Sequence, residues 1–142
     1  MEYSLVSVRE HRGIVREPSD PAGEDQFELA WAFDLDIQHP TPDRVAVRVT
    51  AEVHATPSAP PQIIDFSATH TFEITGRFKP IDELTESSRF FGFYARLTGV
   101  SLGTMRGLVY ARAVSVFAGS LVMPVVNPSE LLKHYLEGKR VT

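Results

Sequence analysis

The sequence contains no cysteine and has no surplus of basic residues. Without cysteine the chain can form no disulfide scaffold and none of the common thiolate zinc sites. Its 142 residues carry 14 lysines and arginines against 18 aspartates and glutamates, a formal net charge of −4. It lacks the basic cluster interleaved with aromatics that neutralises phosphates in nucleic-acid binders. We therefore expect no nucleic-acid partner, no metal and no cofactor.

Long apolar runs are also missing. The longest apolar segment, residues 97–123, is interrupted by Arg106 and Arg112, whereas a membrane span needs about 20 predominantly apolar residues. The N-terminus has no basic region followed by an apolar core, the pattern of a signal peptide. We expect a cytoplasmic protein without membrane insertion, folded as a single domain over residues 1–142.

The first half of the chain alternates apolar and polar residues with a period of two, the spacing of half-buried strands. Proline-rich segments separate the alternating runs, and proline ends strands because it has no N–H for the ladder. Four strands with short connections predict an antiparallel meander or Greek key with one covered face. The runs span residues 3–16, 27–37, 45–53 and 64–74.

The second half changes to helical spacing. A long apolar helix is predicted over residues 100–118. A shorter one should begin at Asn127-Pro128-Ser129-Glu130, where Asn127 can cap and Pro128 suits the first helical position, and should end at Gly138. Strands followed by helices predict an α+β fold: a four-stranded antiparallel sheet with two helices packed on one face.

A serine-hydrolase motif, G-x-S-x-G, occurs at Gly99–Gly103 with Ser101 in the nucleophile position. An elbow of this kind needs a strand entering a strained turn, and the triad partners must follow in order. No strand precedes Ser101, and Glu130 and His134 lie four residues apart on one short helix, where a local pair is the simpler explanation. We expect no catalytic residue and no enzyme activity.

Polar residues of the predicted strands have ordinary explanations. His70 falls on the apolar face, where a core histidine satisfied by one hydrogen bond is favoured over a metal ligand or a base. Four carboxylates are predicted on the solvent face, either simply solvated or forming an acidic docking patch. They are Asp34, Asp36, Glu52 and Glu73.

The same glycines that mimic the hydrolase motif belong to a series of small residues at every fourth position. Gly103, Gly107, Ala111 and Ser115 would draw a low stripe along one helix. Each helical glycine costs about 1 kcal/mol relative to alanine, so close approach by another element is expected to compensate. The covering element is either the terminal helix or the same helix of another subunit.

A run of aromatics precedes this helix without a clean period. Phe90, Phe91, Phe93 and Tyr94 are either ordinary core residues or an exposed binding surface. We predict that they form the walls of an apolar peptide-binding groove, with Trp31 and Phe66 as its floor.

The second half resembles the SecB family of protein-export chaperones, especially its divergent SecB-like members. The residues that carry the resemblance are "SLVMPVVNPSELL" (120–132), similar to the family's L-x-L-x-P-[IV]-N segment before its final helix, and "HTFEITGRF" (70–78), similar to its last strand. The resemblance implies a homotetramer, a dimer of dimers with helices between outward-facing sheets. The small-residue stripe would then be an oligomer interface.

The resemblance further implies an ATP-independent holdase. Its partners would be unfolded client polypeptides, with delivery to the translocase ATPase SecA, or an aggregation-prone antitoxin in a toxin–antitoxin module. Two other classes stay open from the residues alone: a non-catalytic oligomeric adaptor for one folded partner, and an enzyme or small-ligand carrier with a pocket between sheet and helices.

Overall fold

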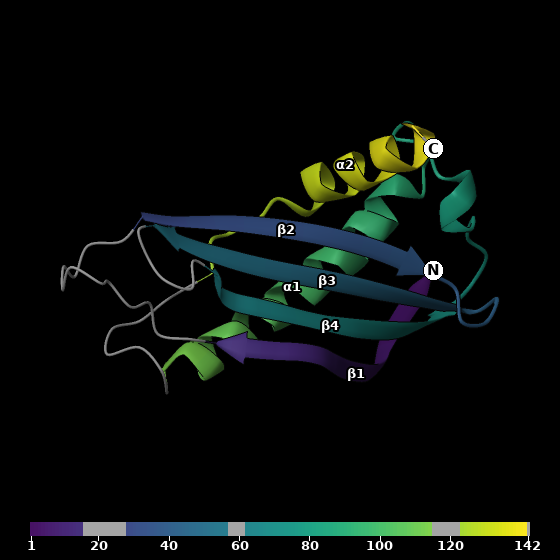
Figure 1. Ribbon diagram of the computed structural model, residues 1–142. Helices are drawn as coiled ribbons and strands as arrows, with labels where there is room; N and C mark the ends of the chain where they lie inside the picture. Colours follow the sequence, from purple (N-terminus) through teal and green to yellow (C-terminus); the bar gives the residue numbers. More distant parts are fainter. Residues whose placement is uncertain (16–27, 57–61, 115–122, 142) are drawn as a thin grey trace.

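The computed structural model describes residues 1–15, 28–56, 62–114 and 123–141. Four strands precede two α-helices along the chain (Figure 1), which confirms the predicted α+β class. The elements are β1 (Glu2–Val15), β2 (Glu28–Gln38), β3 (Arg44–Thr56), β4 (Gln62–Thr75), a 3₁₀ turn η1 (Ile81–Glu83), α1 (Phe91–Val114) and α2 (Pro128–Val141).

The strands form one antiparallel sheet with the order β1-β4-β3-β2. Strands β2, β3 and β4 follow one another as a meander, and β1 pairs with β4 at the opposite side of the sheet from β2. The ladder between β1 and β4 is interrupted after Leu5 and after Glu10, where β1 carries an extra residue. Both β1 and β2 are therefore edge strands of the described sheet.

One face of the sheet is covered by the helices and the other is open (Figure 1). Helix α1 packs on β3 and β4, whereas α2 lies against α1 and β2. The alternation of β4 follows this division, since Phe66 and Phe72 are buried under the helices while Glu73 is exposed. The apolar side of the predicted strands is thus the helix side.

Helix α1 begins at Phe91 rather than near residue 100, so the predicted start is wrong. The aromatic run has a helical period after all, because Phe90, Phe93, Tyr94 and Leu97 follow the i, i+3, i+4, i+7 spacing and are all buried. Gly92 within the run weakened this period in the sequence. The predicted end at residue 118 lies outside the described residues.

The N-terminus of α2 is confirmed. The Asn127 side-chain oxygen accepts hydrogen bonds from the backbone N–H groups of Ser129 (3.0 Å) and Glu130 (3.4 Å), the geometry of an N-cap. The predicted end at Gly138 is wrong, because α2 continues to Val141. An isolated glycine costs a helix only about 1 kcal/mol and does not have to end it.

His70 occupies the core, as predicted, but without the expected hydrogen bond. Its exposed fraction is 0%, and neither ring nitrogen has a hydrogen-bond partner among the described residues. Burial lowers the pKa of His70 below its usual 6.5, because a buried imidazolium loses its hydration. The fold therefore favours the neutral form of this imidazole.

Acidification should therefore destabilise the protein through His70. The unfolded chain protonates His70 near its ordinary pKa of 6.5 while the folded chain does not, so the free energy of unfolding should fall as the pH drops below that value. His70→Leu should flatten this part of the profile, measured by denaturant titration between about pH 7.5 and pH 5. His134→Gln, at a well-exposed histidine, serves as control. Identical slopes for wild type and His70→Leu would contradict the expectation.

Candidate functional site

The serine of the G-x-S-x-G motif lies inside α1. Ser101 has an exposed fraction of 0%, and Gly99 and Gly103 belong to the same helix. A nucleophile elbow needs a strand-to-helix turn that presents an accessible hydroxyl. Ser101 has neither feature in this structure and packs as a helical core residue.

Four of the six aromatics predicted to line a groove are core residues of the single chain. Phe66 and Tyr94 are 0% exposed, and Phe90 and Phe93 are 8% and 7% exposed. The Tyr94 hydroxyl donates a hydrogen bond to the Lys79 carbonyl oxygen, and burial raises the pKa of Tyr94 above its usual range. These side chains stabilise the packing of α1 and do not reach the surface.

The other two predicted aromatics are only partly buried. Phe91 packs at the edge of the core, and Trp31 lies on β2. The Trp31 ring stacks on Phe33 two residues later, with ring centroids 5.9 Å apart and an interplanar angle of 11°. The structure therefore separates the predicted set into a buried group of four, Phe91 at the edge of the core, and Trp31 on an edge strand.

An open cavity lies between this edge strand and α2. Its volume is about 440 Å³, and it is partly apolar because Phe33 and Leu35 of β2 face Leu131 and Tyr135 of α2. The full lining is Phe33, Asp34, Leu35, Asp36, Leu131, His134, Tyr135 and Gly138. We call this cavity the β2–α2 groove.

The backbone of β2 is available along this groove. The Tyr135 hydroxyl accepts a hydrogen bond from the Ile37 N–H (3.3 Å) and lies 3.2 Å from the Ile37 carbonyl oxygen, so the peptide groups of Ile37 point away from β3. Alternate residues of a strand direct their peptide groups to the same side. Leu35 and Phe33 therefore point theirs outward as well, and no strand of the described sheet lies beyond β2 to pair with them.

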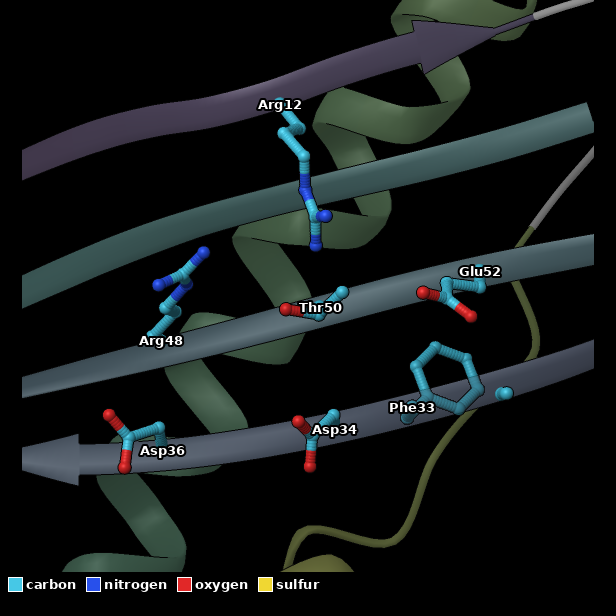
Figure 2. A pocket seen from close by; sticks show the side chains of 8 residues that line it. Arg12, Phe33, Asp34, Asp36, Arg48, Thr50 and Glu52 are labelled. Atoms are coloured by element: carbon cyan, nitrogen blue, oxygen red, sulfur yellow. The ribbon is translucent and has the colours of Figure 1, made fainter.

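The predicted solvent-face carboxylates do lie on the outer face, but they share it with arginines. A cavity of about 490 Å³ on this face is lined by Arg12 and Arg48 as well as by Asp34, Asp36 and Glu52. Figure 2 shows the Arg12 side chain reaching across β4, with Asp34 and Asp36 along β2. The outer face is of mixed charge and not uniformly acidic.

The described part of the small-residue stripe of α1 is not covered by the other described residues. Gly103, Gly107 and Ala111 are exposed, and a Cβ built on either glycine would meet nothing within 4 Å. The terminal helix instead approaches Gly99, where a Cβ would lie 3.5 Å from Pro128. Ser115, the fourth predicted member, lies outside the described residues. Thus α2 does not cover the described part of the stripe.

The groove residues Phe33, Leu35, Leu131 and Tyr135 were absent from the predicted site. Phe33 and Leu35 belong to the same alternating run as Trp31, and Leu131 and Tyr135 are four apart on the stripe of α2. Both patterns are visible in the sequence. What the sequence did not contain was the pairing of this strand with this helix.

Comparison with solved structures shows a similarity of fold. The chain is similar to a SecB-like chaperone of Mycobacterium tuberculosis, solved in complex with a peptide from an antitoxin, with a TM-score of 0.58 and 15% sequence identity over 87% of this chain and 90% of that chain. A Streptococcus agalactiae protein of unknown function matches at a TM-score of 0.38 and 12% identity, covering 86% of this chain and 99% of that chain. No protein-family model and no curated protein matches the sequence. The chain therefore shares its fold with this SecB-like chaperone.

Neither described helix has the length and apolarity that crossing a membrane requires. The described residues also contain no group of three or more histidines and carboxylates arranged to hold a metal ion.

Removing the Tyr135 hydroxyl should loosen α2 from the edge strand. Tyr135→Phe leaves the ring in place but deprives the Ile37 peptide groups of their partner, which should lower the free energy of unfolding by about 1 kcal/mol. Tyr110→Phe, at a tyrosine that is 44% exposed on α1, is the matched control and should change it little. Chemical denaturation of the three proteins measures the difference. Equal stability of all three would show that the hydroxyl does not hold the edge.

Proposed function

We propose that this protein is a SecB-like, ATP-independent holdase that binds unfolded or aggregation-prone polypeptides in the β2–α2 groove. The observation that carries the proposal is the coincidence of an apolar cavity with outward-pointing peptide groups of an edge strand. The similarity of the fold to a chaperone solved with a bound antitoxin peptide supports it. No catalytic group is needed for this role.

The groove suits an extended client segment. A strand added along β2 would form main-chain hydrogen bonds with Phe33 and Leu35, and these bonds do not depend on the client's sequence. Alternate client side chains would enter the apolar space beside Leu131, where their burial adds affinity. Trp31, stacked on Phe33, would extend the apolar floor. Binding of this kind accepts many client sequences. Its strength is set mainly by the rate at which the client dissociates.

In this proposal the walls of the client groove are residues other than the buried aromatics. Phe90, Phe93 and Tyr94 would have to leave the core to touch a client, so their contribution is to hold α1 rigid behind the sheet. The proposed client-contacting set keeps Trp31 from the original prediction and adds Phe33, Leu35, Leu131 and Tyr135.

We further propose that the chain assembles as a cytoplasmic homotetramer, a dimer of dimers. Gly103, Gly107 and Ala111 offer a flat helix surface with room for close approach, and Tyr110 beside them is 44% exposed. On the same side of the sheet Leu5 and Val8 of β1 are 42% and 45% exposed. A second copy packed on this side would cover both.

The second candidate is a chaperone dedicated to one antitoxin. The peptide held by the similar mycobacterial chaperone comes from an antitoxin, and the same groove geometry would serve a single client as well as many. Delivery of clients to SecA, which the family resemblance implies, would be a later step of the general holdase only. The range of clients therefore distinguishes the two roles.

Aggregation assays test the holdase and its groove together. The wild type should suppress light scattering by several unrelated unfolded proteins at stoichiometric ratios, and Leu131→Gln should weaken client binding roughly tenfold because one apolar contact is lost. Val125→Gln, at an apolar residue that is 81% exposed and does not line the groove, is the matched control. Suppression of a cognate antitoxin alone would favour the dedicated role. No suppression by the wild type with any of these clients would contradict both chaperone roles.

Size-exclusion chromatography with light scattering tests the assembly. The wild type should show about four times the chain mass of 15.8 kDa, and the double variant Gly103→Leu, Gly107→Leu should dissociate into smaller species while keeping its circular dichroism spectrum, since the single chain has room for both side chains. Gly138→Leu, at an equally open glycine of α2, should leave the mass unchanged. A monomeric wild type at micromolar concentration would remove the proposed interface.

A further inference from the structure

The outer face of the sheet carries a group of basic side chains around the middle of β4. Thr69 of β4 pairs with Arg9 of β1 on one side and with Arg48 of β3 on the other. Two residues before Thr69, at the next position of β4 on the same face, Ser67 pairs with Arg12 of β1. Thr69 faces away from the core, because its neighbour His70 faces into it, so the paired arginines lie on the outer face. Small hydroxyl residues thus separate three arginines across three strands.

A histidine completes this basic cluster. His11 is the extra residue of β1 between Glu10 and Arg12, and its Nε2 lies 2.6 Å from the Thr69 hydroxyl. The pKa of His11 is lowered, first by partial desolvation and then by the positive charges of Arg48, Arg9 and Arg12. Three guanidinium groups therefore act together on one point above β4.

Few carboxylates neutralise this basic cluster. Asp65 lies 3.4 Å from the Arg12 Nε, whereas no ion pair forms to Arg9 or Arg48 within the described residues. Arg48 donates its Nε hydrogen bond to the Ser67 hydroxyl instead, at 3.0 Å. The next carboxylate along the row is Asp36, which pairs in register with Arg48 from β2. The outer face is therefore basic around Thr69, whereas its β2 side carries Asp34 and Asp36.

Hollows in the surface give access to the cluster. A cavity of about 180 Å³ is lined by His11, Arg48 and Thr69, together with Asp36, Gln38 and Ala46. It shares Arg48 and Asp36 with the larger outer-face cavity of Figure 2, into which Arg12 also reaches. Small side chains in the middle of the sheet leave the guanidinium groups accessible from above.

We propose that Arg9, His11, Arg12 and Arg48 dock a carboxylate-rich segment of a polypeptide partner, on the face of the sheet opposite the client groove. Carboxylates match the guanidinium fork and can bind it with two parallel hydrogen bonds. Asp34, Asp36 and Glu52 repel an anion that extends toward β2, so the footprint is confined to the β1–β4–β3 side. This short footprint suits an acidic peptide stretch better than a continuous polyphosphate backbone.

The basic cluster is separate from the β2–α2 groove, on which the proposed function rests. The β2–α2 groove lies on the helix side and at the other edge of the sheet, so a partner on the basic cluster leaves the groove open. The two surfaces can be disabled independently, and failure of one test does not decide the other.

Fluorescence anisotropy with three labelled probes tests the proposal. They are a short peptide of alternating Glu and Ser, its Gln counterpart, and an oligothymidine of equal charge. The wild type should bind the Glu peptide, lose it as NaCl rises from about 50 to 300 mM, and bind the other two more weakly. Arg9→Gln with Arg48→Gln should weaken the Glu peptide roughly tenfold, as expected for two exposed charge pairs.

The matched control removes the same charge elsewhere. Arg77→Gln with Arg96→Gln changes two exposed arginines outside the basic cluster and should leave the affinity for the Glu peptide within about twofold. Circular dichroism of both double variants verifies folding, and Arg9→Glu alone provides a charge reversal at an exposed position. Equal binding of the Gln peptide, equal loss in the control variant, or stronger binding of the oligothymidine would each overturn the proposal.

Discussion

The main constraint on this fold is the number of helices. Two helices on one face of a four-stranded sheet cannot bury that whole face and both edge strands. Helix α1 crosses β3 and β4, the central strands, and α2 reaches only part of β2. The central strands are accordingly sealed, with Val45, Val47 and Val49 at 0% exposure. The edge strands β1 and β2 are covered less. The exposed apolar residues of β1 and the β2–α2 groove both result from this incomplete cover.

Buried polar groups show how firmly the centre is sealed. His70 and Ser101 are 0% exposed and keep unpartnered polar atoms among the described residues, an arrangement that costs free energy relative to apolar residues of similar size. Arg112 ties the far end of α1 to β1 through Glu10 at 2.8 Å. The centre of the sheet is thus closed to solvent on the helix side, and α1 is attached to the edge strand β1.

Alternation and capping made most of the fold predictable from the sequence. The period of two placed four strands, and Asn127-Pro128 placed the start of α2, because these signals act over a few neighbouring residues. The start of α1 was missed because Gly92 and Gly99 weakened a helical period that Phe90, Phe93 and Leu97 nevertheless kept. The groove was missed for a different reason, since the placement of Phe33 and Leu131 at one cavity depends on topology, which local patterns do not encode.

The same limit applied to charge. Asp34 and Asp36 were correctly placed on the outer face, but Arg9 and Arg12 came from β1, a strand that the sequence joins to β2 and the sheet places beside β4. Read by itself, β2 predicts an acidic face. Only the order β1-β4-β3-β2 brings Arg9 and Arg48 to either side of Thr69, with Asp36 beyond Arg48 on β2.

The Tyr135 hydroxyl has a consequence for the length of any strand that pairs with β2. By occupying both peptide groups of Ile37 it blocks the ladder there, so a visiting chain can register only with residues before it, chiefly Leu35, Phe33 and Trp31. This free segment of β2 accommodates about half a dozen residues of extended backbone. An unfolded protein contains many stretches of that size. If several copies of the chain assemble, their binding sites together would hold one long polypeptide by avidity, although each single contact lasts only briefly.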